Sequence, residues 1–111
     1  MANRLLLARI ATVKPKGHLS AANTKALEEQ LIKAIKSPEN SIILVDMSQV
    51  NFIDSAALMV LVKVFRQAQS MNKRFSLCSV APSVSIIFEL CQLNNVFEIF
   101  ETFQVFESTL N

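Results

Sequence analysis

The chain is poor in the residues that mark several classes of protein. Its 111 residues include one glycine, three prolines and two cysteines, and neither tryptophan nor tyrosine. So little glycine and proline excludes fibrous and disordered chains, and a single glycine, Gly17, leaves no glycine-rich phosphate loop. Hydrophobic residues make up 51% of the chain, and eight of them are phenylalanines. We therefore expect one core and a single domain over residues 1–111.

Long hydrophobic runs and export signals are also missing. No apolar run approaches the roughly 20 residues that a membrane-spanning helix needs. Leu5–Leu7 is flanked closely by Arg4 and Arg9, which is not the pattern of a signal peptide. We therefore expect a cytoplasmic protein without membrane insertion. In that reducing compartment Cys78 and Cys91, which stand in apolar surroundings, are expected to be buried free thiols.

Charge is modest and unevenly distributed. A net charge of +2 is too small to predict nucleic-acid binding. Residues 1–36 hold seven Lys or Arg and two Glu, whereas residues 37–111 hold four basic and seven acidic residues. The basic N-terminal portion could steer an acidic partner, but an ordinary solvated surface explains it as well.

The residue types of an active site do not gather in the sequence. The single histidine, His18, has no nearby Ser/Asp or Cys partner. Carboxylates are scattered, apart from Glu28–Glu29 on the polar side of a predicted helix. A metal site needs at least three clustered ligands. We therefore expect neither an enzyme nor a cofactor or metal.

Hydrophobic periodicity predicts alternating strands and helices. One bent strand or two short ones are expected at residues 4–13, and single strands at residues 42–45, 75–80 and 96–100. The segments between and after them predict helices from Ala21 to Ser37–Pro38, from the Ser55 region to Asn72, from Pro82 to a left-handed stop at Asn94–Asn95, and over 102–110. Ser20 or Asn23 is expected to cap the first helix, and the third is expected to bury Val84, Ile87, Phe88 and Cys91. This order predicts an α/β fold with parallel crossovers, with the apolar strand at 42–45 in its centre.

The most informative segment is the start of the second helix, Ile53-Asp54-Ser55-Ala56-Ala57-Leu58. Asp54 can accept hydrogen bonds from the first free N–H groups of the helix. A phosphate on the exposed Ser55 hydroxyl would meet the positive helix end. Spacing alone leaves two interpretations open, a simple helix cap or a reversible phosphorylation switch. Asp46, at the end of the central strand, and the turn Gly17–Ser20 are expected at the same sheet edge, where partners dock.

Several short motifs occur together in a fixed order. They are LVDMS at 44–48, VNFIDS at 50–55, VAPSV at 80–84 and LCQLNNVFEIF at 90–100, and the turn GHLS at 17–20 fits less closely. In order and spacing they resemble the STAS family, the anti-sigma-factor antagonists of bacterial partner-switching systems. The resemblance implies a single STAS-like domain with a small, mostly parallel mixed sheet and about four helices. It places partner binding at Gly17, Ser20, Asp46, Asp54, Ser55, Ala56 and Ala57.

The resemblance also implies a function. Ser55 takes the position of the phospho-acceptor. The implied protein binds a serine-kinase anti-sigma factor, is switched off when that kinase phosphorylates Ser55, and is restored by a PP2C-type phosphatase, with no cofactor of its own.

Two departures from the family favour an alternative. The usual Ser/Thr-Gly after the acceptor is Ala56-Ala57, and the aspartate often found in the first turn is Ser20. These changes remove freedom at the turn and one charge contact. The alternative is a non-phosphorylated STAS subunit that stabilises a larger assembly, such as an ABC transporter complex.

Overall fold

A four-stranded parallel sheet forms the centre of the molecule. The structure is a computed structural model and describes residues 9–110. In spatial order the strands are β1 (Ile10–Val13), β3 (Ile42–Asp46), β5 (Arg74–Cys78) and β6 (Glu98–Phe100). Each neighbouring pair is parallel, as the α/β pattern predicts. The part of the expected first strand that precedes Arg9 lies outside the described residues.

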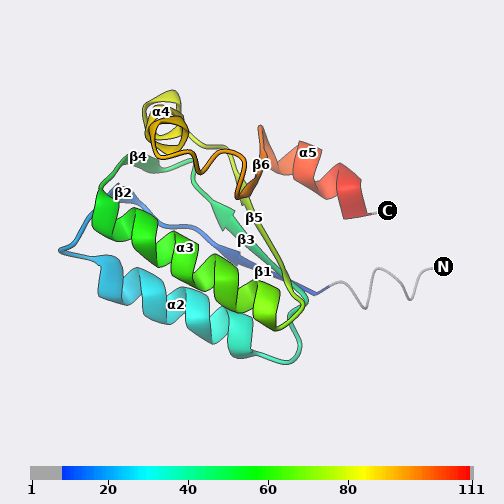
Figure 1. The fold of residues 1–111 in the computed structure, drawn as a ribbon. Helices are drawn as coiled ribbons and strands as arrows, with labels where there is room; N and C mark the ends of the chain where they lie inside the picture. The colour runs from blue at the N-terminus through cyan, green and yellow to red at the C-terminus, as the bar shows by residue number, and fades with distance from the viewer. Residues whose placement is uncertain (1–8, 111) are drawn as a thin grey trace.

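The helices cover the two faces of this sheet unequally. They are α2 (Thr24–Lys36), α3 (Ser55–Ser70), α4 (Pro82–Leu90) and α5 (Phe103–Glu107), followed by the 3-10 turn η1 (Ser108–Leu110). Figure 1 shows α2 and α3 side by side across one face, α4 beside β4, and α5 next to β6. The expected small α/β domain with a mostly parallel sheet and about four helices is therefore confirmed.

Alternation along β3 divides the interior into two clusters. Ile43 and Val45 pack in the main cluster with α2, α3 and α4, whereas Ile42 and Leu44 pack with Phe106 of α5 on the other side. All four are buried, as a central strand covered on both faces requires. The sequence spacing predicts one apolar side of α2, formed by Leu27, Leu31, Ala34 and Ile35. Leu27, Leu31 and Ile35 are buried in the main cluster, and Ala34 packs against it, partly buried. Each fully buried large side chain contributes about 1.5–3 kcal/mol.

A second, two-stranded parallel sheet joins β2 (Gly17–Leu19) to β4 (Val50–Ile53). Neither segment is among the strands expected from the sequence, so this sheet is an addition to the expected fold. The register shifts between Gly17 and His18. Gly17 has φ +77, the left-handed region that favours glycine. The small sheet brings the end of β4, and with it the start of α3, beside the loop after β2.

Two predictions at the ends of helices are wrong. Cys91 is exposed, because α4 ends at Leu90 and Cys91, its C-cap residue, lies past Phe88, the last buried position of the helix. The left-handed residue after α4 is Gln92, with φ 59, instead of Asn94–Asn95. Cys78 is buried as predicted, and burial raises the pKa of its thiol.

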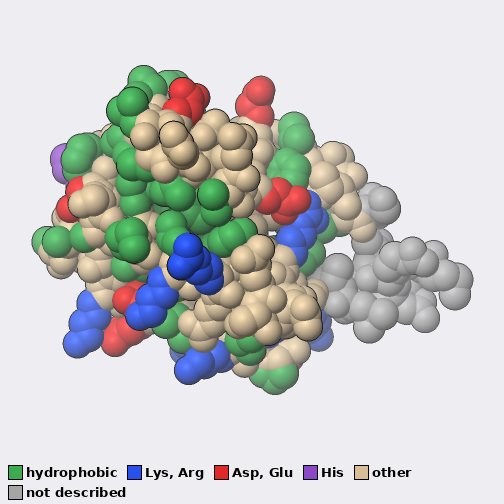
Figure 2. All heavy atoms as spheres, viewed as in Figure 1, with side chains coloured by type: hydrophobic (Ala, Val, Ile, Leu, Met, Phe, Trp, Pro, Cys, Tyr) green, Lys and Arg blue, Asp and Glu red, His purple; other side chains and the backbone are tan. Residues whose placement is uncertain are grey.

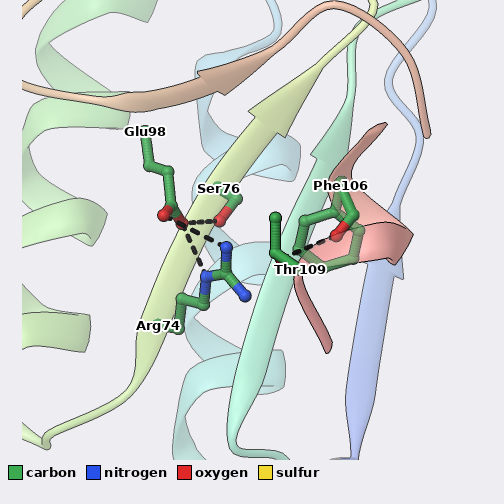
Figure 3. A network of polar contacts seen from close by, with 5 residues as sticks. All are labelled: Arg74, Ser76, Glu98, Phe106 and Thr109. Carbon is green, nitrogen blue, oxygen red and sulfur yellow. Dashed lines mark hydrogen bonds and ion pairs between the residues drawn. The ribbon is translucent and has the colours of Figure 1, made fainter. Parts of the chain in front are cut away.

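The α5 face of the sheet is held by one arginine. Arg74 donates to both oxygens of Glu98, with Nε–Oε1 2.6 Å and Nη2–Oε2 3.1 Å, and Glu98 also accepts from the Ser76 hydroxyl (Figure 3). The guanidinium lies 5.5 Å from the ring centre of Phe100 and 5.2 Å from that of Phe106, within the range of cation–π attraction. Phe106 is 0% exposed, so α5 is anchored by an aromatic side chain beneath a paired cation.

We expect Phe106→Ala to lower the free energy of unfolding by about 3–5 kcal/mol, the usual loss for a buried phenylalanine. The matched control is Val105→Ala, since Val105 is 47% exposed on the same helix and should change stability by less than about 0.5 kcal/mol. Urea denaturation followed by circular dichroism measures both. Equal midpoints for the two variants would mean that α5 does not contribute to the stability of the domain.

Candidate functional site

The side chain of Asp54 ties two distant segments together. It is the N-cap of α3, and its Oδ1 accepts a hydrogen bond from the Ala57 N–H at 3.0 Å. Its Oδ2 accepts from the Ala21 N–H, also at 3.0 Å, and its own N–H donates to the Leu19 carbonyl at 3.0 Å. These three bonds fix the start of α3 against the loop between β2 and α2.

The same contacts stabilise the charged form of the carboxyl. The Ala57 N–H is the main cause that holds the pKa of Asp54 below its usual value. Burial opposes this effect, and the N–H groups of Ala21 and Ala56 add to the lowering of the pKa. The charged Asp54 thus joins the start of α3 to the loop between β2 and α2, and is not only the helix cap that the sequence suggests. We call this set of contacts the Asp54 clasp.

Ser55 is presented to solvent by this arrangement. It is the first residue of α3 and is exposed, and its hydroxyl makes no hydrogen bond to any of residues 9–110. Ala56 is half-buried, whereas Ala57 is 0% exposed and belongs to the main core. A modifying enzyme can therefore reach the Ser55 hydroxyl, while the methyl group of Ala57 faces inward.

The loop that Asp54 holds is itself closed by side-chain contacts. Asn23 accepts from the Ser20 N–H at 2.8 Å and donates to the His18 carbonyl at 2.7 Å. The expectation that Ser20 or Asn23 caps the first helix is wrong in one respect. Asn23 has the N-cap position, but α2 has no side-chain capping hydrogen bond, because the Asn23 amide is used inside the loop. The half-buried Ser20 lies in this closed turn.

Asp46 and Gly17 lie at the other end of the small sheet. Asp46 accepts from the Ser48 N–H at 2.9 Å, and its carboxylate lies 3.9 Å from the Lys14 ammonium. Gly17 donates its N–H to the carbonyl of Gln49 at 2.8 Å. The length of β4, on the order of 10 Å, separates these groups from Ser55. Of the predicted site residues, the structure gathers Ser20, Asp54, Ser55, Ala56 and Ala57 at one end and leaves Gly17 and Asp46 at the other.

Sequence reasoning misses two groups at this site. The first is the N–H of Ala21, a backbone donor that no residue type signals. The second is an exposed aromatic pair, His18 and Phe52, whose ring centres lie 5.6 Å apart. They become neighbours only through the pairing of β2 with β4, and Phe52 remains 44% exposed. The lone histidine is therefore a surface residue whose ring lies beside that of a phenylalanine, tilted by 57°.

Among residues 9–110 no three His, Cys, Asp or Glu side chains are grouped so that they could hold a metal ion. No helix in that range is both long and apolar enough to cross a membrane.

Asp54→Asn should loosen the clasp, because one carbonyl oxygen cannot accept well from both N–H groups and the negative charge is lost. The lowered pKa fixes the sign of the pH dependence. A carboxyl with a lower pKa in the folded than in the unfolded state, where it is about 3.9, stabilises the fold fully above that value and loses this effect as pH falls through the folded pKa.

We therefore expect Asp54→Asn to have a lower melting temperature than the unmodified protein at pH 7, with a gap that shrinks below about pH 4. The Ala21 amide should also exchange its hydrogen faster. Scanning calorimetry and amide exchange by NMR measure these effects, with Glu29→Gln on the exposed side of α2 as the control. A gap that persists unchanged into acid would contradict the assigned role of the charge.

Comparison with known proteins agrees with this architecture. A protein from Bordetella bronchiseptica that bears the name anti-sigma factor antagonist BtrV is 28% identical over 83 residues, which cover 75% of this chain and 71% of that protein. A protein from Thermotoga maritima that is named as an anti-sigma factor antagonist has the same fold, with a TM-score of 0.84 at 20% identity over 91% of this chain and 86% of its own. The Bacillus cell fate determinant SpoIIAA, solved in its phosphorylated form, gives a TM-score of 0.71 at 14% identity, covering 93% of this chain and 92% of its own.

A family model supplies the assignment. The model of the STAS domain matches residues 7–105, a range that includes the sheet, helices α2 to α4 and the Asp54 clasp. The chain therefore belongs to the STAS domain family.

Proposed function

We propose that this protein is an anti-sigma-factor antagonist that binds a serine-kinase anti-sigma factor in the cytoplasm and is released when that kinase phosphorylates Ser55. The observation that carries the proposal is the state of the Ser55 hydroxyl. It is exposed on the first turn of α3, it has no hydrogen-bond partner within residues 9–110, and it stands on a backbone fixed by the Asp54 clasp. The antagonists of similar sequence and fold support the general role.

The proposed switch is electrostatic. The kinase transfers the γ-phosphoryl group of ATP to the Ser55 oxygen and releases ADP, while the hydroxyl proton passes to a base of the kinase. The phosphate carries about −1.5 to −2 charges at neutral pH and adjoins the charged Asp54 carboxylate. The Ala57 N–H, which the helix end offers to an anion, is already bonded to Asp54. The added charge therefore stays on the surface, where it repels the partner.

The binding surface we propose centres on Ser55, Ser20 and Ala56, with Asp54 and Ala57 holding them in place from beneath. Gly17 and Asp46 would contribute only if the partner also reaches the far end of the small sheet. A PP2C-type phosphatase would hydrolyse the phosphate and restore binding. In this cycle the protein is a ligand and a substrate, and the kinase supplies the catalytic groups.

Mass spectrometry of the protein isolated from its own cells, before and after phosphatase treatment, tests the proposal directly. One phosphate mapped to Ser55 supports the switch. A protein that stays unmodified and co-purifies with a membrane transporter would instead favour the structural-subunit alternative, which the two alanines and Ser20 make plausible on sequence grounds.

Ser55→Ala should fold normally and bind the kinase without ever accepting phosphate. Its free energy of unfolding should change by less than about 0.5 kcal/mol, because an exposed side chain with no partner is removed. The control is Ser48→Ala, another exposed serine, which should be labelled as the unmodified protein is. Incubation with the kinase and radiolabelled ATP distinguishes the two, and label retained by Ser55→Ala would place the phosphorylation site elsewhere.

Ser55→Asp should weaken binding to the kinase, since it places a second carboxylate beside Asp54, while the melting temperature stays nearly unchanged. Ser48→Asp adds the same charge at the other end of β4 and should bind with nearly unchanged affinity. Titration calorimetry with the purified kinase measures both dissociation constants. Equal affinities for the two variants would contradict the electrostatic account.

A further inference from the structure

A surface groove runs from Ser55 along α3, next to the end of α4. Its volume is about 320 Å³. Most of its wall is apolar, and the residues that line it include Ser55, Leu58, Met59, Val62, Arg66 and Cys91. Figure 2 shows hydrophobic side chains gathered over this part of the surface, with Lys and Arg side chains below them.

The positions on α3 form one continuous stripe. Ser55, Met59, Val62 and Arg66 follow one another at intervals of four, three and four residues, which places them on the same side of a helix. At 1.5 Å per residue the stripe is about 16 Å long, or three turns. Ser55 is at one end and Arg66 at the other, so the groove leads directly away from the proposed phosphorylation site.

One apolar member of the stripe is open to water, since Met59 is 64% exposed. Met59 lies with Leu58 and Val62 in the apolar wall of the groove, and an apolar surface left in water is typical of a site that binds another protein. Methionine also adapts its shape readily to a partner.

Arg66 gives the groove a charge at the end far from Ser55. Within residues 9–110 it makes no ion pair or hydrogen bond, whereas Lys63, three residues earlier, pairs with Glu28 at 2.5 Å. The two cations are therefore not equivalent, because one is already neutralised by this chain and the other is available. A partner that buries the apolar stripe would need an acidic group to satisfy Arg66.

We propose that this groove docks an amphipathic segment of the kinase, about 16 Å long, that has apolar side chains facing Met59 and Val62 and a carboxylate facing Arg66. The inference rests on the proposed function, since the occupant is the kinase that phosphorylates Ser55. A helix laid in a groove with anchors spaced by three or four residues is a common mode of recognition. Docking there would hold the Ser55 hydroxyl at the active site of the kinase.

The geometry also separates docking from switching. About 16 Å lies between Ser55 and Arg66 along the helix, which is twice the screening distance of roughly 8 Å at physiological salt. A phosphate on Ser55 therefore leaves the Arg66 contact unaffected. Loss of the Arg66 contact should weaken kinase binding by the same factor in the unmodified chain and in Ser55→Asp, because distant contacts contribute independently.

The natural cysteines provide a direct test. Cys91 is exposed in the groove, and Cys78 is buried and so serves as an unreactive internal reference. The kinase is first recovered with the Ser55→Ala variant as bait. It is then identified by its transfer of phosphate to Ser55 of the unmodified protein, and purified. At saturating kinase without ATP, we expect N-ethylmaleimide to label Cys91 at least tenfold more slowly than in the free protein. A Cys91→Ser, Val105→Cys variant, with its thiol on α5, should be labelled at an unchanged rate.

Paired substitutions test the charge and the apolar stripe separately. Arg66→Ala and Met59→Ser should each weaken kinase binding about tenfold, the size of an interface hot-spot contact, both in the unmodified chain and in Ser55→Asp. The matched control for Arg66→Ala is Lys63→Ala, which removes a neighbouring cation. The control for Met59→Ser is Val105→Ser, which changes an exposed apolar residue on α5. Both controls should bind the kinase as the unmodified protein does.

The possible outcomes distinguish failure of the groove proposal from failure of the phosphorylation proposal. If the kinase binds and phosphorylates Ser55 while Cys91 remains fully reactive and Arg66→Ala binds like Lys63→Ala, the groove proposal is wrong and the phosphorylation switch stands. If no kinase binds the unmodified protein, both proposals are wrong. If Cys91 becomes protected at high protein concentration without any kinase, a second copy of this chain occupies the groove, and the kinase-docking proposal is overturned.

Discussion

The geometry of the site depends on one carboxylate that joins two segments of the backbone. Asp54 accepts one hydrogen bond from within its own helix and a second from Ala21, which is 33 residues away in sequence. Hydrogen bonds from backbone N–H groups to a charged carboxylate are stronger than neutral ones, and the positive end of α3 favours the same charge. Because Ser55 follows directly, its exposed hydroxyl is carried by a fixed turn. A partner would therefore meet Ser55 in one position.

This fixed position favours a local switch over a change of fold. A phosphate on Ser55 would act mainly within the roughly 8 Å over which exposed charges are felt at physiological salt, a range that includes Asp54 and the loop it holds. The Arg74–Glu98 pair and Phe106 lie across the sheet in a separate packing cluster. The strand β3 is buried on both faces, and such close-packed interiors do not deform gradually. Helix α5 is therefore expected to stabilise the domain without taking part in switching.

The sequence predicts what periodicity and charge determine, and it misses what pairing between distant segments determines. The stripe of Leu27, Leu31 and Ile35 and the doubly apolar β3 follow from local pattern, and the structure confirms them. Strand β4 buries only its two end residues, so its pattern does not alternate, and its pairing with β2 is visible only in three dimensions. Cys91 continues the helical period of α4 beyond the residue where that helix ends. The donor at Ala21 belongs to the backbone and has no signature in the sequence, although the cap at Asp54 does.

The two departures from the family pattern bear on where binding energy comes from, and they do not block access to Ser55. The methyl group of Ala57 is fully buried in the core, and alanine is favoured over glycine within a helix by about 1 kcal/mol. The turn therefore gains stability and loses freedom. Ser20 lacks the carboxylate that the family often places in the first turn, so the proposed kinase would find one charge fewer at this end of α3. A docking contact along the groove, ending at the available guanidinium of Arg66, would supply affinity at the opposite end of the same helix.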